Sequence, residues 1–394
     1  MRDPAHTANP MENLGALATA ALIFSSVAIT IGVFGIGAAL PRIADAFAAE
    51  PNARLMVQIA GGIAAPAFAL ASPFAGRFIS RHGERTTYVW SIWLVILTGT
   101  AGALVTAPWQ LIALRALLGV GIAGVITAAK GGIGQTGERR RHLLYSLVAF
   151  LGSAAGIAIY PLVGALAKIE WRYAFLSNLL LIPLALLALT LPRLAVPRVV
   201  DRTAGSRSLT AGLPLELIFT AVACGWAIVM VPLHAPFYLK SVGITDPVHI
   251  GSVLSIASTF TLAGALGYTL VQRLVGTRTA LALALGVIAT GAFLTGLGGV
   301  WPLEFAGLCL AALGTGVFAG AIYAYAMESA PRTAPGEIAG MVNLSMYGPQ
   351  ILFPMAAGAV SAALGPASPY AMVGILIVVA MIANHFGGRR RAGA

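Results

Sequence analysis

Apolar residues fill the chain in twelve stretches, each long enough to cross a bilayer as a helix and separated by short polar joints. A helix needs about 20 apolar residues for this, because its backbone must satisfy its own hydrogen bonds in the hydrocarbon. The first six stretches are Leu14–Leu40, Leu55–Phe78, Tyr88–Ala107, Trp109–Ile133, Leu143–Ala167 and Ala174–Leu194. The second six are Leu213–Leu239, Ile250–Val271, Thr279–Val300, Leu303–Met327, Ile338–Leu364 and Pro369–Phe386. The pattern predicts an all-α membrane protein with twelve transmembrane helices.

Composition agrees with this class and argues against most others. Hydrophobic residues make up 58% of the chain and charged residues only 9%, which no soluble fold could accommodate. The two cysteines, Cys224 and Cys309, fall within predicted helices, so we expect no disulfide framework, metal or cofactor. A membrane enzyme acting on lipids is a distant alternative. It would need paired carboxylates, an activated nucleophile or clustered metal ligands, and the sequence shows none of these patterns.

The net charge of +11 is distributed unevenly between the two sides of the predicted bundle. If both termini are cytoplasmic, 18 of the 24 Lys and Arg fall on that side, five fall on the other, and Arg115 lies within a span. This asymmetry follows the positive-inside rule. It predicts cytoplasmic termini in a multi-pass protein of the inner (cytoplasmic) membrane, and a basic surface that faces anionic lipid and not nucleic acid.

The two halves of the chain resemble each other. Gly119 and Gly121 in the fourth span match Gly314 and Gly316 in the tenth at an offset of 195 residues. The second and eighth spans also end alike, in Gly76…Arg81-His82-Gly83-Glu84-Arg85-Thr86 and Gly267…Arg273…Gly276-Thr277-Arg278-Thr279. Duplicated six-helix units suggest two bundles that rock against each other around a central site.

A polar stretch from about Arg193 to Thr210, with four arginines and Pro197, divides these units. We therefore expect an N-terminal bundle over residues 1–194, a cytoplasmic linker over 195–211 and a C-terminal bundle over 212–394.

The run Gly119-Val120-Gly121-Ile122-Ala123-Gly124 satisfies the GxGxxG dinucleotide fingerprint. That motif works only between a strand and a helix, where backbone amides face a pyrophosphate. Inside an apolar helix, glycines instead let neighbouring helices approach closely. We therefore expect no nucleotide cofactor.

Three motifs resemble those of the major facilitator superfamily, and within it the twelve-helix drug and metabolite proton antiporters. In the loop after the second span, Gly76, Arg81, Gly83 and Arg85 fit the family's signature, while Ser80 replaces its usual aspartate and Glu84 a common basic residue. Arg115-x-x-x-Gly119-x-Gly121-x-x-Gly124 matches the fourth-helix motif. Gly156-x-x-x-Tyr160-Pro161-x-x-Gly164-Ala165 keeps the fifth-helix antiporter motif in part, since Tyr160 and Ala165 replace two glycines.

This resemblance implies the major facilitator fold, with two six-helix bundles, and a secondary transporter that works by alternating access. The expected function is proton-coupled efflux of a small organic molecule by a monomer, without catalysis. The loop from Gly76 to Arg85 would be a conformational gate, whose latch the loss of the aspartate at Ser80 puts in doubt. An importer or facilitator of an organic anion is the alternative.

Charged residues inside the spans narrow the choice of substrate. None of the 13 Asp and Glu lies near the middle of a span, whereas Arg115 does. A desolvated cation needs a counter-charge, so we expect a neutral, amphipathic or anionic substrate. Arg115 could attract an anionic group, or it could brace the bundle through carbonyls of neighbouring helices.

Polar and aromatic residues within the spans are candidates for a central cavity. Asn343, Tyr347 and Gln350 follow i, i+4, i+7 and should share one helix face. The other cavity candidates are Phe34, Tyr160, Tyr323 and Tyr325. His234 lies between Pro232 and Pro236, which should break the outer end of the seventh helix and free carbonyls beside a titratable ring. His234, Glu304 and Asp45, just beyond the first span, are the candidates for carrying protons.

Overall fold

The computed structural model describes residues 14–192, 214–329 and 335–392, and these residues form helices and short connections without strands. The predicted linker at 195–211 lies outside the described residues. Eleven helical segments of the described chain are long and apolar enough to cross a membrane. The remaining predicted span is also present, as a continuous helical segment over residues 335–364 that changes its winding midway.

Six helical spans form the first half of the chain. Their elements are α1 (Ala16–Ile23), α2 (Ser25–Ile29), η1 (Thr30–Phe34), η2 (Gly35–Ala39) and α3 (Leu40–Ala46) in the first span; α4 (Ala53–Gly62) and α5 (Ala64–His82) in the second; α6 (Glu84–Ala101) and η3 (Gly102–Leu104) in the third; α7 (Pro108–Gly134); α8 (Glu138–Ile169); and η4 (Trp171–Leu181) with α9 (Ile182–Ala188).

Six further spans form the second half. Their elements are α10 (Leu215–Val229), η5 (Met230–His234) and α11 (Ala235–Ser241) in the seventh; α12 (Pro247–Val275); α13 (Thr277–Gly296); α14 (Trp301–Ser329); α15 (Pro335–Tyr347), η6 (Gly348–Leu352) and α16 (Phe353–Leu364) in the eleventh; and α17 (Ser368–Ala392).

The structure corrects two expectations about the helix ends. The first span runs to Ala46, six residues beyond the predicted end, so Asp45 lies inside α3 and not beyond the helix. The prolines at 232 and 236 do not break the seventh span. Met230–His234 instead forms a π-helical turn, the wider winding that relieves the clash of a proline ring within a helix. A second π-helical turn, Thr30–Phe34, stands in the first span, so both halves of the chain carry one.

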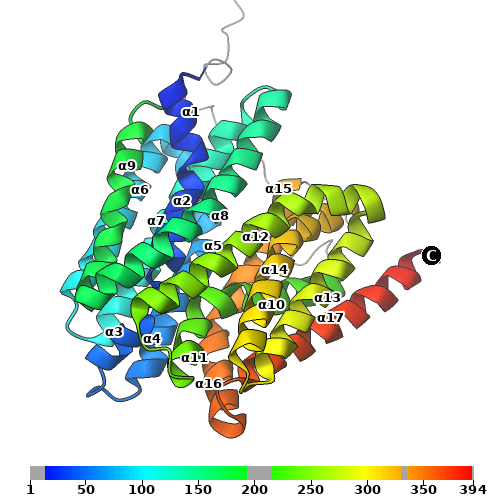
Figure 1. The fold of residues 1–394 in the computed structure, drawn as a ribbon. Coiled ribbons are helices and arrows are strands. Elements are labelled where there is room, and N and C mark those ends of the chain that lie inside the picture. Colours follow the sequence, from blue (N-terminus) through cyan, green and yellow to red (C-terminus); the bar gives the residue numbers. More distant parts are fainter. Residues whose placement is uncertain (1–13, 193–213, 330–334, 393–394) are drawn as a thin grey trace, which may run out of the picture.

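The helices gather into two groups that stand side by side, α1–α9 on one side and α10–α17 on the other (Figure 1). The fifth and eighth spans meet along the seam between them. A methyl group on Gly164 of α8 would overlap the Pro247 carbonyl, and one on Gly251 of α12 would overlap the Tyr160 carbonyl. These glycines allow the two backbones to touch. The fifth-helix motif therefore lies on the contact between the halves.

Glycines of the fourth and tenth spans have the packing role expected inside a membrane helix. A side chain on Gly119 would overlap the Ala64 carbonyl of the second span, and one on Gly316 would overlap the Thr261 carbonyl of the eighth. Gly121 and Gly314 similarly press against the third and ninth spans. The GxGxxG run thus joins three helices of one bundle.

The junctions α5–α6 and α12–α13 each turn on one glycine. Gly83 has φ 81° and ψ 162°, and Gly276 has φ 80° and ψ 164°. A residue with a Cβ rarely adopts this backbone conformation, which explains glycine at both positions. The near-identical angles confirm that the second and eighth spans end alike. We call the side of the molecule with Leu14, Gly83 and Gly276 the N-terminal face, and the side with Asp45 and Asp246 the far face.

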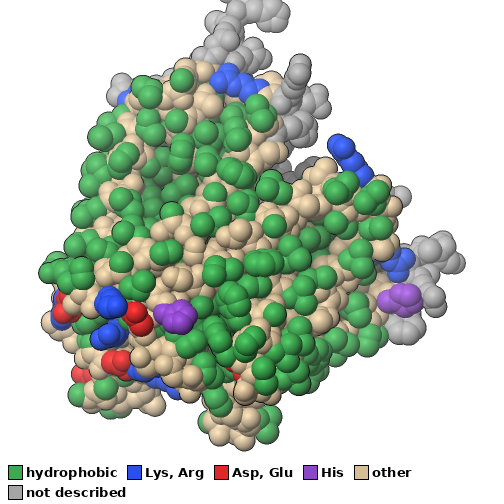
Figure 2. Space-filling model, viewed as in Figure 1, with side chains coloured by type: hydrophobic (Ala, Val, Ile, Leu, Met, Phe, Trp, Pro, Cys, Tyr) green, Lys and Arg blue, Asp and Glu red, His purple; other side chains and the backbone are tan. Residues whose placement is uncertain are grey.

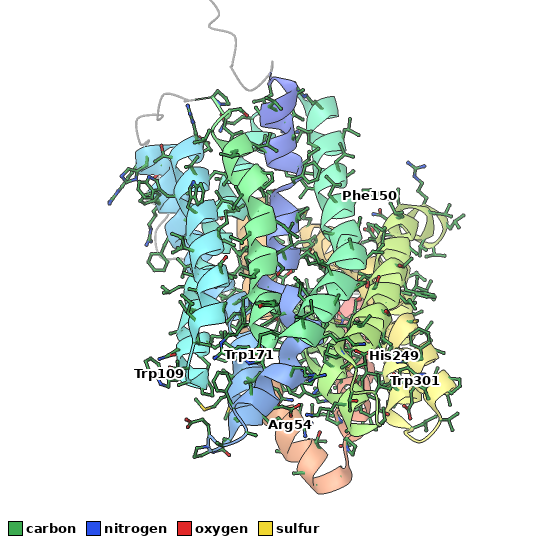
Figure 3. All side chains as sticks on the ribbon, turned by 60° about the vertical axis from the view of Figure 1, so that its left-hand side comes forward. Arg54, Trp109, Phe150, Trp171, His249 and Trp301 are labelled. Atoms are coloured by element: carbon green, nitrogen blue, oxygen red, sulfur yellow. The ribbon has the colours of Figure 1, made fainter. Side chains whose placement is uncertain are left out.

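The outer surface is suited to lipid. In Figure 2 hydrophobic side chains cover the middle of the visible face, while acidic and basic ones gather toward its margins. Trp109, Trp171 and Trp301 all lie toward the far face, at the same end as Arg54 and His249, whereas Phe150 lies in the other half (Figure 3). Tryptophan is enriched at the membrane interface, so these rings mark one boundary of the bilayer.

Candidate functional site

A cavity of about 270 Å³ lies between the two bundles. Its walls come from α2, η1, α5, α7 and α8 of the first half and from α14 and α15 of the second. Its lining residues are Ser26, Ile29, Val33, Phe34, Ala65, Phe68, Ile122, Ile126, Lys130, Tyr145, Val148, Ala149, Tyr323, Asn343 and Tyr347. A site with walls on both bundles changes shape when the bundles move, as a transport site must.

The position of the lining residues shows toward which face the cavity extends. Phe34 lies near the middle of the first span. Lys130 precedes the end of α7 by only four residues, and Tyr145 follows the start of α8 by seven. Because both of those helix ends lie at the N-terminal face, the cavity extends from the middle of the molecule toward that face.

Two aromatic and polar contacts organise the wall of the second half. The Tyr323 hydroxyl donates a hydrogen bond of 2.6 Å to Oδ1 of Asn343, which joins α14 to α15. The Tyr347 ring packs edge-on against Phe68 across the bundle interface, with centroids 5.6 Å apart. Tyr323, Asn343 and Tyr347, which the sequence predicted for the cavity, thus line it together with the Phe68 ring, which the sequence did not predict.

The opposite wall is held by hydroxyl groups of the first span. Ser26 donates to the Val148 carbonyl at 2.6 Å, and Thr30 donates to the Gly152 carbonyl at 2.7 Å. Both acceptors lie on α8, so α2 and η1 are fixed against the fifth span. The Ser26 side chain is therefore both part of the lining and part of the packing.

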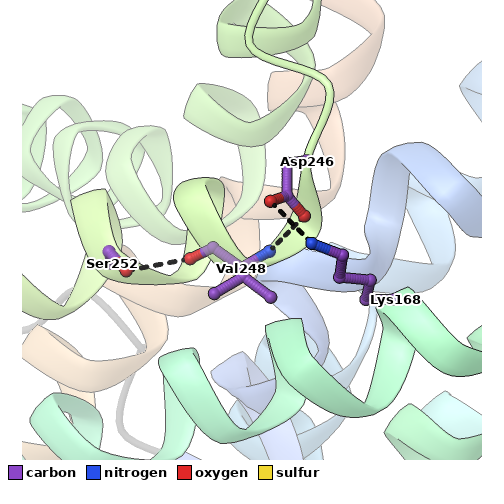
Figure 4. A network of polar contacts seen from close by, with 4 residues as sticks. All are labelled: Lys168, Asp246, Val248 and Ser252. Carbon is purple, nitrogen blue, oxygen red and sulfur yellow. Dashed lines mark hydrogen bonds and ion pairs between the residues drawn. The ribbon is translucent and has the colours of Figure 1, made fainter.

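Ion pairs join the two bundles at the far face. Lys240 at the end of α11 pairs with Asp45 of α3, and Lys168 of α8 pairs with Asp246 at 3.2 Å. Asp246 also caps α12, because its side chain accepts a hydrogen bond of 3.2 Å from the Val248 amide (Figure 4). The Lys168 ammonium holds the pKa of the Asp246 carboxyl below its usual range, chiefly through the hydrogen bond between them. These pairs tie the bundles together on the side opposite the cavity.

At the N-terminal face, the two helix junctions carry matching hydrogen bonds. Nε2 of Gln135, at the end of α7, donates to Oε1 of Glu84 at 2.6 Å. In the second half, the Thr277 hydroxyl donates to Oε1 of Glu328, at the end of α14, also at 2.6 Å. In each pair the two residues are 51 positions apart in the sequence. The acid stands at the junction in the first half and at the end of the partner helix in the second. Glu84, where the family often has a basic residue, therefore has its own partner here.

In the rest of the predicted gate loop, Ser80 and Arg81 are exposed, whereas Gly76, Gly83 and Arg85 are half-buried. Ser80 donates to the Arg77 carbonyl three residues earlier at 2.8 Å, a local bond within α5. Among the described residues, no ion pair is formed by Arg81 or Arg85.

Arg115 is buried among backbone carbonyls. Its guanidinium donates to the carbonyls of Gly32 and Val33 in η1, and to those of Ala60 at 3.3 Å and Gly61 at 3.5 Å in α4. A π-helical turn changes the usual hydrogen-bond register, and Arg115 supplies donors to the carbonyls there. It is not part of the cavity lining. The contacts favour the bracing interpretation of Arg115.

The other predicted residues lie outside this cavity. Gln350 falls in the 3₁₀ segment η6, whose tighter winding carries it off the face of Asn343 and Tyr347, and it donates to the Gly225 carbonyl at 3.1 Å. Tyr160 is buried in the seam beside α12. Tyr325 lines a separate pocket of the second bundle with Arg278 and Asn384. His234 and Glu304 are buried together inside the second bundle.

Sequence reasoning missed Lys130, Tyr145, Ser26 and Phe68 as lining residues. Lys130 is one of the 18 basic residues that the charge asymmetry assigns to the cytoplasmic side, although it falls within the predicted fourth span and within α7. That position was a usable signal, because a charge within a span must face protein or water. Phe68 and Tyr145 offered no such signal, since aromatic residues are common on every face of a membrane helix.

These features define a membrane transporter: a helical protein with two similar bundles and a central cavity that both of them line. The model of the Major Facilitator Superfamily matches residues 22–344, and the chain belongs to that superfamily. It is therefore a transporter and not an enzyme.

Individual relatives agree with this class. The multidrug efflux protein YfmO of Bacillus subtilis (strain 168) is 25% identical over 391 residues, which cover 95% of this chain and 93% of that protein. Among solved structures, a D-xylose-proton symporter aligns with a TM-score of 0.75 at 16% identity, over 93% of this chain and 96% of its own. The nucleoside transporter NupG aligns with a TM-score of 0.71 at 12% identity, over 95% of this chain and 99% of its own. The two structures confirm the fold.

Proposed function

We propose that this protein exports a small neutral or anionic amphipathic molecule from the cytoplasm by alternating access, driven by the proton gradient across the inner membrane. The observation that carries the proposal is the cavity lined by both bundles, together with the Lys–Asp pairs that join the bundles on its far side. In this arrangement substrate enters from the N-terminal face, and release requires the far face to open. The surplus of Lys and Arg on the N-terminal side supports a cytoplasmic location for that face.

The cavity lining supports the proposed substrate class. Nine of its 15 residues are aliphatic or phenylalanine side chains, and the polar ones are Ser26, Lys130, Tyr145, Tyr323, Asn343 and Tyr347. The one charged residue of this lining is the cation Lys130, and none is acidic. An organic cation would enter without a counter-charge, whereas an anion could pair with Lys130 and a neutral molecule could bind through the aromatic rings.

Export and proton coupling rest on different support. The similarity to a multidrug efflux protein along nearly the whole chain supports export. Proton coupling is supported by the buried titratable residues His234 and Glu304, which lie outside the substrate cavity and could change protonation without touching substrate.

Transport by the purified protein in proteoliposomes tests the proposal. Three fluorescent amphipathic probes of similar size, one anionic, one neutral and one cationic, would be offered with and without a pH gradient. The proposal predicts gradient-dependent movement of the neutral or anionic probe and none of the cationic one. Transport of the cationic probe alone would overturn the substrate class. Transport of a probe at the same rate with and without the pH gradient would identify a facilitator.

A further inference from the structure

Four polar side chains meet inside the second bundle, near the far face and apart from the substrate cavity. Glu304 stands in the first turn of α14, Tyr238 in α11, Tyr370 at the start of α17, and His234 at the end of the π-helical turn η5. The Tyr370 ring lies 5.5 Å from the His234 ring and 5.1 Å from the Tyr238 ring, centroid to centroid. The Glu304 side chain lies near both tyrosine hydroxyls and is close enough to that of Tyr238 for a hydrogen bond between them.

This cluster is buried and its polar atoms are unsatisfied. Glu304 is 2% exposed, Tyr238 1%, Tyr370 0% and His234 5%. Within the described part of the chain, Glu304 Oε1, the hydroxyls of Tyr238 and Tyr370, and His234 Nε2 have no partner in regular hydrogen-bond geometry. Most buried polar atoms in proteins have a partner, so four unpaired ones in one cluster require an explanation.

A proton supplies that explanation. Burial of an ionised carboxylate without a partner is unfavourable, and the cost is removed when the group is neutral. A protonated Glu304 carries an O–H that can donate to a neighbouring tyrosine hydroxyl, which in turn can donate onward. Neutral His234 keeps one ring nitrogen as an acceptor for the other end of such a chain.

Charges around the cluster favour the acid over the imidazole as the place of the proton. Arg54 of α4, in the first bundle, reaches the helix that carries His234, and its guanidinium lies 5.5 Å from the centroid of the Phe237 ring three residues on. A nearby cation opposes a charged imidazolium. The ring facing His234 from α16 is Phe353, at 5.7 Å, and it brings no charge.

The cluster also adjoins the contacts that must change when the bundles move. In the same π-helical turn, the Pro232 carbonyl faces Gly37 of η2 so closely that no side chain would fit at Gly37. Leu233 lies against Gly61 of α4. The residues before His234 therefore contact the first bundle, while His234 itself points to the interior of the second. A change of hydrogen bonding at His234 acts directly on this seam.

We propose that Glu304 binds the coupling proton, and that Tyr238, Tyr370 and His234 complete a proton site which the π-helical turn connects to the seam between the bundles. On protonation a carboxylate oxygen gains the proton, and its new O–H donates to the Tyr238 hydroxyl. On deprotonation the buried charge disfavours the packing of the bundles in which the far face is closed. This inference rests on the proposed function for its role in transport, but the site itself is a claim about the chain alone.

Infrared spectroscopy of the purified protein tests the site without any substrate. The proposal predicts a carbonyl-stretch band of a buried carboxylic acid near neutral pH, absent in Glu304→Gln and retained in Glu328→Gln. Glutamine keeps the shape of a protonated glutamate, and Glu328 is a matched control on the same helix that already accepts a bond from Thr277. Tyr238→Phe should move the band to higher frequency, because the acid loses its acceptor. A band unchanged in Glu304→Gln would overturn the proposal.

Transport separates failure of this inference from failure of the proposed function. If wild-type transport depends on the pH gradient, Glu304→Gln should retain probe exchange and lose the gradient-driven component, and His234→Gln should shift its pH dependence. Gradient-driven transport that persists in Glu304→Gln overturns the inference and leaves the proposed function standing. Wild-type transport without any gradient dependence overturns proton coupling, and with it the transport role of the site.

Discussion

Asp45 and Lys240 pair across the seam between the bundles, and they are 195 residues apart, the separation that also relates the glycine pairs of the fourth and tenth spans. The two residues therefore occupy equivalent ends of the first and seventh spans, one with an acid and the other with a base. Opposite charges at equivalent positions let the repeated units attract each other at the far face. Lys168 and Asp246 add a second pair between the bundles.

Removal of these pairs should shift the protein toward a state open at the far face. We expect Asp45→Asn with Asp246→Asn to lengthen the distance between spin labels on the far-face ends of α3 and α11, measured by double electron–electron resonance. Both residues are exposed, and asparagine keeps an oxygen that can cap α12 at position 246, so the fold should persist. The exchange Asp45→Lys with Lys240→Asp should restore the short distance. Unchanged distances in the double variant would contradict a closing role.

The same closure should resist mild acid. The Asp246 carboxyl has its pKa lowered by Lys168, so its contribution is present above the ordinary pKa of aspartate, about 4, and is lost only as pH falls through the lower value in the folded protein. We therefore expect the far-face distances to stay constant from neutral pH to about pH 5. Opening of the far face within that range would point to another titrating group. If Glu304→Gln abolished this opening, the effect would belong to the buried cluster.

Arg115 should matter for folding more than for substrate. Arg115→Ala leaves carbonyls of η1 and α4 without their donor inside the bundle, which should lower stability by about 3 kcal/mol. Arg115→Lys should recover little of it, because an ammonium cannot reach carbonyls on two helices as the planar guanidinium does. Thermal unfolding in detergent measures this. A normally stable Arg115→Ala protein that fails to transport would instead give Arg115 a direct role.

The cavity wall offers a closely matched test of the substrate site. Tyr323→Phe removes the bond to Asn343 within the lining, while Tyr325→Phe alters the same helix two residues on, in a separate pocket. Only Tyr323→Phe should change the KM for a transported probe. Lys130→Gln should raise the KM of an anionic probe about tenfold, the effect of one lost charge-assisted bond of roughly 1.5 kcal/mol, and leave a neutral probe unaffected.

The close contact of the fifth and eighth spans should tolerate no added atoms. Gly164→Ala places a methyl group on the Pro247 carbonyl and should destabilise the seam by about 1–3 kcal/mol. Gly267→Ala on α12 has open space around it and serves as the control. Thermal unfolding and transport should both fall in the first variant only. Equal behaviour of the two variants would show that the seam is looser than described.

The sequence predicted the fold in detail, because apolar length and glycine spacing are local signals that the bilayer makes decisive. The twelve spans, the packing role of Gly119 and the matching junctions at Gly83 and Gly276 followed from these signals. The windings did not, since one π-helical turn contains the ring of Pro232 and the carbonyls of the other are satisfied by Arg115 from a distant helix. Gln350 is the clearest case: a regular helix would have kept it beside Tyr347, and the 3₁₀ turn moved it.

Side-chain partners across helices were equally hidden from the sequence. His234 and Glu304 were each candidates for carrying a proton, but their closeness depends on α11 and α17, which bring Tyr238 and Tyr370 between them. Lys130 could have been recognised from its position within a span. Its neighbours on α14 and α15 come from the other half of the chain, beyond the reach of any local pattern.

Access to Phe34 from the two faces tests alternating access most directly. Phe34 lines the cavity near the middle of the first span, and the native cysteines Cys224 and Cys309 are free and buried and would first be replaced by alanine. In that background, Phe34→Cys would be treated with an impermeant thiol reagent in inside-out and in right-side-out vesicles. The account predicts labelling from both faces, faster from the N-terminal face, with the far-face rate increased by Asp45→Asn and Asp246→Asn. Labelling from one face only, unchanged by those substitutions, would contradict it.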